Sequence, residues 1–210
     1  MFRAMIIKLI PLVLLSIVGC AGRDNKNAAP ASLVPSIVPG TIHPTEKTQI
    51  NLAKSIVKWK GTKLMGAGSH SGTVKFKSGH LLFSNGQLAG GQFEVDMTSI
   101  YNTDIPLSDP VPRKNITFHL NSDFETNQYP TSRFIITGVQ KRDGVFTIEG
   151  TLIIKGIENK ITFKAVKSSD NVYSAEFSFN RFDWEIGENG TWLEKKLVDP
   201  LIHLNVIIQT

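Results

Sequence analysis

The chain has 210 residues, of which 41% are hydrophobic and 20% are charged. This composition is typical of a globular protein with room for one sizeable domain, and it excludes a chain that is disordered throughout. The formal net charge of +5 is small and the lysines are scattered, so nucleic acid is not expected as a partner. The single cysteine, Cys20, excludes a disulfide framework, and no cluster of Cys and His indicates a metal site.

Residues 1–19 have the pattern of a secretory signal. Arg3 and Lys8 precede an apolar run over residues 9–18, and this run is shorter than the roughly 20 residues that a membrane-spanning helix needs. Removal of the segment leaves 21 basic and 18 acidic residues (23 minus 2, against 18), which is a net charge of +3. We therefore expect the mature protein to begin after residue 19.

The end of this signal indicates a lipid anchor. The run closes in Ile17-Val18-Gly19-Cys20, which resembles the lipobox of bacterial lipoproteins. That resemblance implies cleavage before Cys20 and acylation of its thiol and new amino terminus. Because each buried CH₂ contributes about 0.8 kcal/mol, two or three chains anchor stably. Ala21, which is not acidic, favours the outer membrane with the protein facing the periplasm; an ordinary secretory signal with a free cysteine is the alternative.

Residues 20–47, the lipidated cysteine and the stretch after it, are predicted to form a flexible tether. Prolines, alanines and small polar residues fill this stretch, and no apolar periodicity runs through it. Such a composition cannot bury a core and behaves as a linker. One folded domain is therefore predicted over residues 48–210.

From Gln49 onward, apolar and polar residues alternate as in strands with one buried face. Turn signals separate the runs: Ser78-Gly79, Ser84-Asn85-Gly86, Arg142-Asp143-Gly144, Lys155-Gly156, Ser169-Asp170-Asn171 and Glu188-Asn189-Gly190. About eight strands with one apolar phase each predict an antiparallel sheet around a shared interior, closed into a barrel because closure removes exposed edges. A two-sheet sandwich fits the same pattern. Only residues 109–127 lack alternation, and a short helix is predicted there, near His119 to Asp123.

The inward phase supplies candidate lining residues for a tunnel. They are Phe76, Phe93, Val95, Met97, Phe134, Ile136, Phe163, Phe177, Phe179 and Leu204. An eight-stranded barrel is near the size at which side chains either fill the interior or leave room for one small ligand. A filled barrel, serving as an anchored interaction module, is therefore an alternative to a ligand-binding one.

Catalytic groups are sparse in this sequence. His70 and His119 are candidate general bases of a small hydrolase or isomerase, provided that a carboxylate such as Asp96 or Asp123 orients the ring. No zinc-protease motif, nucleophile elbow or phosphate loop accompanies them. We therefore expect a protein that is not an enzyme, with the histidines in structural roles.

A second polar group lies near the end of the chain. Arg181 and Asp183 are candidates for orienting a ligand head group, although an ion pair at the barrel rim is favoured. Trp184 and Trp192 are interpreted as packing at the same rim.

Seven segments, taken together and in order, resemble those of a known family. They are residues 59–61, 69–76, 90–100, 119–124, 129–134, 150–157 and 179–184, which read WKG, SHSGTVKF, GGQFEVDMTSI, HLNSDF, YPTSRF, GTLIIKGI and FNRFDW. The chain over residues 49–210 thereby resembles the YceI-like family of bacterial periplasmic, polyisoprenoid-binding proteins. Two departures from the family pattern are Phe124-Glu125, where a Phe pair is common, and the Arg113 to Phe118 stretch before the His-Leu motif.

The resemblance implies an all-β fold: an extended, lipocalin-like, eight-stranded antiparallel barrel with a short helix between its middle strands. It implies that the tunnel holds a long apolar isoprenoid of the quinone or polyprenyl type as a bound ligand, with no cofactor or metal. The expected partners are this lipid and, through Cys20, the membrane, and a homodimer is left open. The expected location is the cell envelope.

Overall fold

The computed structural model describes residues 44–63, 68–187 and 198–210. The predicted signal segment, the anchor cysteine and the last turn signal, Glu188-Asn189-Gly190, lie outside these ranges, as does Trp192. In chain order the elements are β1 (Glu46–Gln49), β2 (Ile56–Lys63), β3 (Ser69–Ser84), β4 (Gln87–Asn102), α1 (Pro110–Asp123), β5 (Thr131–Arg142), β6 (Val145–Ile154), β7 (Ile157–Ser169), β8 (Val172–Asn180), the 3₁₀ helix η2 (Arg181–Trp184) and β9 (Val198–Gln209). β1 begins within the stretch assigned above to the tether.

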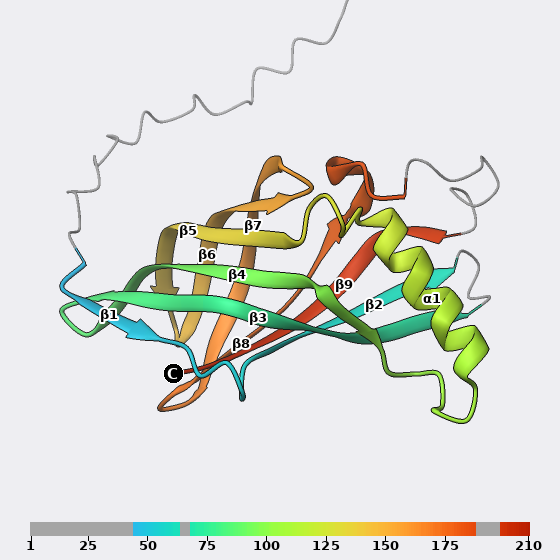
Figure 1. The fold of residues 1–210 in the computed structure, drawn as a ribbon. Helices are drawn as coiled ribbons and strands as arrows, with labels where there is room; N and C mark the ends of the chain where they lie inside the picture. The colour runs from blue at the N-terminus through green and yellow to red at the C-terminus, as the bar shows by residue number, and fades with distance from the viewer. Residues whose placement is uncertain (1–43, 64–67, 188–197) are drawn as a thin grey trace, which may run out of the picture. The chain divides into compact units, whose positions relative to one another are not determined.

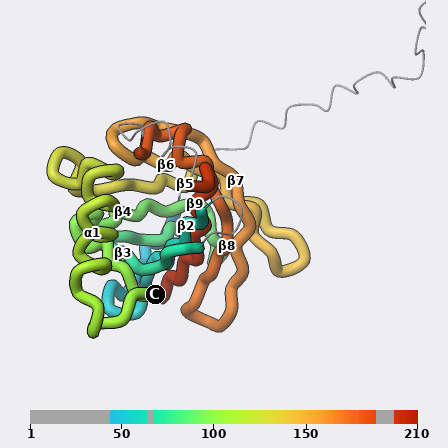
Figure 2. The backbone as a smooth tube through the Cα atoms, turned by 90° about the vertical axis from the view of Figure 1, so that its right-hand side faces the viewer, coloured from blue at the N-terminus to red at the C-terminus, as the bar shows by residue number. Residues whose placement is uncertain are grey.

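The sheet closes on itself. Each strand from β3 to β8 pairs antiparallel with the next in sequence, and β2 pairs with both β3 and β9. Eight strands, β2 to β9, thus form a closed antiparallel barrel, while β1 adds to the free half of β3 (Figures 1 and 2). The predicted barrel is confirmed, and the two-sheet alternative is wrong because one continuous ladder joins every strand.

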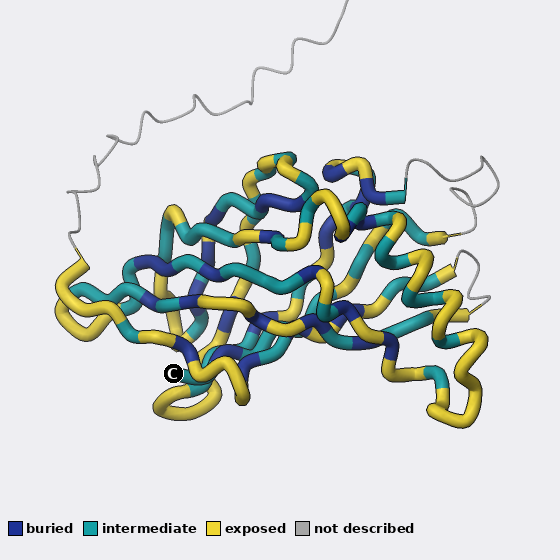
Figure 3. Tube along the Cα trace, in the orientation of Figure 1, coloured by how far each residue is buried: buried dark blue, intermediate teal, exposed yellow. Residues whose placement is uncertain are grey.

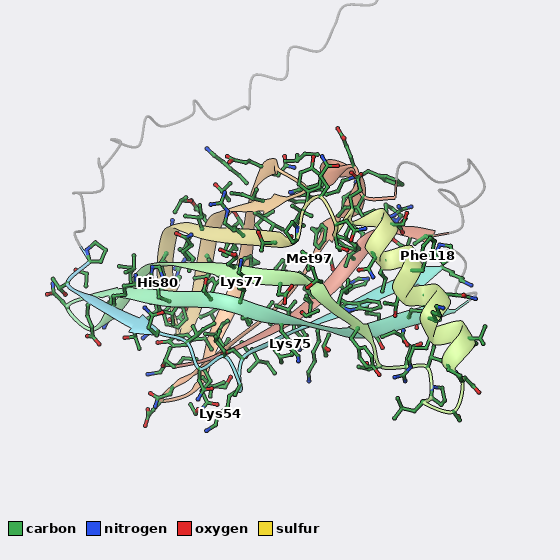
Figure 4. All side chains as sticks on the ribbon, viewed as in Figure 1. Lys54, Lys75, Lys77, His80, Met97 and Phe118 are labelled. Carbon is green, nitrogen blue, oxygen red and sulfur yellow. The ribbon has the colours of Figure 1, made fainter. Side chains whose placement is uncertain are left out.

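The apolar and polar residues that alternate along the sequence are alternately buried and exposed in the barrel wall. Val57 and Trp59 on β2 are buried between exposed lysines, and Met97 on β4 is buried as well. Lys75 and Lys77, labelled in Figure 4, are exposed on β3. Figure 3 shows the consequence, with buried positions recurring along the strands and exposed ones gathered at the turns and on α1.

Four hairpins of the described residues close with two-residue turns, and three of these turns share one backbone geometry. Asn85-Gly86, Asp143-Gly144 and Lys155-Gly156 all have positive φ at both central residues, for example 49° and 72° in the first. Turns with two positive φ values match the right-handed twist of antiparallel strands, and glycine adopts the second position without strain. These turns are where the sequence predicts them.

The predicted turn at Ser78-Gly79 is wrong. Both residues lie inside β3, where the pairing with β4 shifts register between Phe76 and Ser78. A side chain at Gly79 would place its Cβ 2.7 Å from the Phe93 ring and 2.9 Å from Ile50 Cδ1. Glycine is required here for close packing at a bulge, which gives the same local signal as a turn.

Helix α1 lies at one end of the barrel, beside the end of β4 (Figures 1 and 2). It covers the predicted helical stretch and starts earlier, with prolines in its first turn, where their missing N–H groups cost nothing. Arg113 fastens it to the barrel by donating to the Tyr101 hydroxyl and the Ile105 carbonyl. The helix buries no side chain, and Phe118 on it (labelled in Figure 4) is 70% exposed.

Candidate functional site

The barrel encloses a cavity of about 770 Å³. Side chains from all eight barrel strands line it, together with residues of α1 and of the segment after β8. The lining on β4 runs from Leu88 to Ile100. Strands that rise about 3.3 Å per residue and tilt by 35–45° place these two residues roughly 30 Å apart along the barrel axis. The interior is therefore elongated and hollow rather than filled.

All ten residues proposed from the sequence as tunnel lining do line this cavity. They are Phe76, Phe93, Val95, Met97, Phe134, Ile136, Phe163, Phe177, Phe179 and Leu204. Whether they touch a ligand stays a prediction.

Aromatic rings form much of the wall. Phe163 and Phe177 stack with centroids 4.2 Å apart and planes 9° apart, and Phe134 lies 5.4 Å from Phe163. On β3 and β4, the centroids of the Phe76 and Phe93 rings are 5.9 Å apart. Such contacts hold the rings in place, so the wall offers a fixed apolar surface.

Small residues also shape the barrel wall. Ala165 on β7 and Ala175 on β8 are paired neighbours, and both line the cavity. At Gly150 on β6, an added Cβ would fall 2.4 Å from Phe134 Cζ, so the absence of a side chain there accommodates that ring. The lining predicted from the sequence did not include Ala165 or Ala175.

Other lining residues were missed for different reasons. Val57 and Trp59 on β2 line the cavity, and their alternation with lysines was a usable signal. Ile116 and Leu120 line it from α1, where no periodic pattern marks which side of the helix faces the barrel.

The polar lining is concentrated at the end of the barrel where α1 lies. Here, at what we call the polar end, six charged or ionisable residues line the cavity: Lys63, His70, His119, Asp123, Arg181 and Asp199. They come from the end of β2, the start of β3, the second half of α1, η2 and the start of β9. The rest of the interior is mainly aliphatic and aromatic. The cavity thus has an apolar body with ionisable groups at one end.

A hydrogen-bond network holds His70. Its Nδ1 lies 2.9 Å from Asp104 Oδ2, and the Ser71 amide and Asn102 Nδ2 donate to Oδ1 of the same carboxylate. Burial raises the pKa of Asp104, but the hydrogen bonds from Ser71, His70 and Asn102 outweigh it, so the pKa lies below its usual value. Asp104 therefore remains a carboxylate at neutral pH.

The carboxylate that orients His70 is not one of the two expected from the sequence. Asp104, which was not singled out in the sequence, orients His70, whereas Asp96 accepts hydrogen bonds from the amide and hydroxyl of Thr98. The negative charge of Asp123 acts on the guanidinium of Arg181. The partner of His70 is 34 positions away in sequence, so only the fold brings the two together.

Arg181 is buried, with 6% of its surface exposed. Its guanidinium donates to the Ile186 carbonyl at 2.9 Å and stacks over the Phe182 ring at 4.2 Å. Burial lowers the pKa of Arg181, and the charge of Asp123 opposes that shift. The acidic group acting on Arg181 is thus Asp123 rather than the predicted Asp183.

Trp184 is more than rim packing. It is 1% exposed, packs edge-on against Phe179 at 5.1 Å, and donates from Nε1 to the Leu152 carbonyl. Glu125, which departs from the family pattern, forms an ion pair between its carboxylate and Lys155 Nζ at 2.5 Å. Both contacts fix the strand ends and η2 around the polar end.

Metal and membrane-spanning features are not found in the described ranges. No group of three or more His, Cys, Asp or Glu residues among residues 44–63, 68–187 and 198–210 could hold a metal ion. Within the same ranges, no helix has the length and apolar character needed to cross a bilayer.

The fold and its elongated interior define a closed β-barrel with an internal apolar cavity. The model of the YceI-like domain matches residues 49–210, and the chain belongs to that family. No curated protein matches the chain.

Two solved structures share this fold. BcnA of Burkholderia cenocepacia has 18% identity and a TM-score of 0.63, and the match covers 77% of this chain and 99% of BcnA. A polyisoprenoid binding domain from Saccharophagus degradans, implicated in plant cell wall breakdown, has 14% identity and a TM-score of 0.52, with coverage of 76% and 95%. At these identities the likeness establishes the fold.

Proposed function

We propose that this protein is a membrane-tethered lipid-binding protein that holds a long apolar isoprenoid, of the quinone or polyprenyl type, inside the barrel. The observation that carries the proposal is the elongated apolar cavity of about 770 Å³. Small-molecule sites are commonly 300–1,000 Å³ and mostly apolar, with a few polar groups that fix orientation. The polyisoprenoid binding named for the Saccharophagus degradans domain supports the same ligand class.

The energetics suit a chain-shaped guest. Burying on the order of 600 Å² of apolar ligand surface at about 25 cal/mol per Å² gives about 15 kcal/mol before costs. Ordering a flexible chain and losing free translation remove much of this gain. Because the surplus comes from hydrocarbon burial, tight binding needs no charged site along the body of the cavity. Binding rather than catalysis is the function that this interior supports.

A pair of variants on one strand tests the proposal. Ala165→Phe adds a phenyl ring to the cavity wall, whereas Val166→Phe adds a similar ring next to it at a position that is 42% exposed. If the added ring excludes only two CH₂ groups of ligand, at about 0.8 kcal/mol each, affinity falls by more than about tenfold.

Binding is measured by titrating each purified protein with a quinone that has a long isoprenoid tail, followed by native mass spectrometry. We expect one ligand per chain for the wild type and Val166→Phe, and weak binding for Ala165→Phe. Equal affinity in all three proteins would mean that the ligand sits elsewhere. Failure of the wild type to bind either a quinone or a polyprenol would refute the proposal.

The membrane tether is tested separately. Cys20→Ser removes the thiol that the lipobox resemblance assigns for acylation, and two or three acyl chains account for stable anchoring. After cell fractionation, the wild-type protein should sediment with membranes and the variant should remain in the soluble envelope fraction. Sedimentation of the variant with membranes would contradict the tether.

A further inference from the structure

The Asp104 carboxylate is fixed independently of His70. The Ser71 amide donates to its Oδ1 at 2.8 Å and Asn102 Nδ2 donates to the same oxygen at 2.5 Å. Asn102 is fully buried, and its Oδ1 accepts from the Ile105 amide at 3.0 Å. The Thr103 amide also donates to the Ser71 carbonyl at 2.9 Å. These bonds join the start of β3 to the end of β4 without help from the imidazole.

The network determines the hydrogen-bonding character of the imidazole. An ionised carboxylate has no proton to donate, so His70 Nδ1 must carry the proton in the 2.9 Å contact with Asp104. In the neutral ring the second nitrogen, Nε2, is then a hydrogen-bond acceptor. The carboxylate thus selects one tautomer and leaves one defined acceptor on the ring.

That acceptor is placed at the polar end of the cavity. His70 lines the cavity, whereas Asp104 and Asn102 do not. Because Nδ1 is engaged by Asp104, Nε2 is the ring nitrogen left for a ligand in the cavity. The His70 side chain is 34% exposed, so the ring is not sealed by its neighbours.

We propose that His70 Nε2 accepts a hydrogen bond from a hydroxyl group at the polar end of the bound isoprenoid. The ligand class is an isoprenoid with a hydroxyl head, either the alcohol of a polyprenol or the phenol of a reduced quinone. An oxidised quinone or a bare hydrocarbon offers no proton to this acceptor. The inference rests on the proposed function and specifies the head group of the lipid that the apolar body holds.

Two pairs of probes isolate the hydroxyl proton. Geranylgeraniol is compared with its methyl ether, and a menaquinol, kept reduced under anaerobic conditions, is compared with its dimethyl ether. Each ether keeps the isoprenoid chain and the oxygen but lacks the proton. Because hydration differences between alcohol and ether are the same for every protein variant, the change in the alcohol-to-ether affinity ratio between variants reports the contact itself.

Three substitutions separate binding from structure. In His70→Asn the amide can occupy the place of Nδ1 and keep the bond to Asp104, while Nε2 is deleted. In His70→Gln the longer amide can reach the place of Nε2 and restore an acceptor. His80→Asn is the matched control, because His80 lies on the other half of β3 and is not among the cavity-lining residues.

One hydrogen bond of about 1 kcal/mol corresponds to roughly a fivefold preference. For at least one of the two ligand pairs, we expect the alcohol-to-ether affinity ratio of the wild type to be about fivefold higher than that of His70→Asn. His80→Asn should have the wild-type ratio, and His70→Gln should have an intermediate one. The pair that responds identifies the source of the hydroxyl. Suppose that His70→Asn still binds the isoprenoids and unfolds at the wild-type urea concentration. An alcohol-to-ether affinity ratio equal to that of the wild type would then overturn this inference but not the proposed function. Failure of the wild type to bind any of the four ligands would overturn the proposed function as well.

Discussion

Gly150→Ala tests whether the cavity wall is as tightly fitted as the structure indicates. A Cβ built at this position lies 2.4 Å and 2.5 Å from two atoms of the Phe134 ring and 2.6 Å from the Ile135 carbonyl oxygen. The ring cannot move freely, since it packs 5.4 Å from Phe163. One of the obstacles is backbone, so a rotamer change of Phe134 alone cannot relieve the clash.

The expected loss of stability comes from adding a methyl group where the barrel wall is already tightly packed. Adding carbon atoms to a well-packed region costs about 1–3 kcal/mol. A glycine-to-alanine change without a clash has the opposite sign and stabilises by about 0.4–1 kcal/mol, because it restricts the unfolded chain. Gly61 on β2 provides that control, since its Cβ would meet no atom within 4 Å.

Urea unfolding followed by circular dichroism measures both variants. We expect Gly150→Ala to lower the free energy of unfolding by about 1–3 kcal/mol with an unchanged denaturant slope, and Gly61→Ala to leave it equal or slightly higher. In the background of Phe134→Leu, which removes the ring, the cost of Gly150→Ala should fall by at least about 0.5 kcal/mol. Equal stability of Gly150→Ala and wild type would refute the description of this wall.

Two further predictions concern the polar end. Trp184→Phe removes the Nε1 hydrogen bond to the Leu152 carbonyl and should lower the free energy of unfolding by about 1–2 kcal/mol in urea; no loss would show that the bond contributes nothing. Because the pKa of Asp104 is lowered in the folded protein, its stabilisation is present above the unfolded pKa near 3.9 and is lost as pH falls through the folded value. Asp104→Asn should therefore destabilise at pH 7, and the difference from wild type should shrink below about pH 4; a constant difference across this range would contradict the assignment.

The strands and the barrel could be predicted because a closed barrel has one interior, so each strand shows one apolar phase. Val57 and Trp59 alternating with lysines, and the Asn85-Gly86 turn, each carry this information locally. The same periodicity identified ten residues that line the cavity. Neither the hollow itself nor the small residues beside it could be predicted, because a filled barrel and a hollow one have the same alternation.

The features that were predicted wrongly or not at all have one physical cause: tertiary contacts decide which structure a local sequence pattern adopts. Ser78-Gly79 reads as a turn in isolation, but packing of Phe93 and Ile50 over Gly79 makes it a bulge. Helix α1 buries no side chain and thus has no apolar stripe to mark its length. The pair of His70 with Asp104 joins two strand ends that no sequence spacing relates.

A crystal structure of the protein with a long-tailed isoprenoid alcohol or quinone would examine the cavity most directly. We expect continuous ligand density along the barrel axis, with the hydrocarbon against Phe163 and Phe177 and the oxygen-bearing head among the residues of the polar end. A ligand bound on the outer surface, or a barrel whose interior has closed around its own side chains, would contradict this expectation.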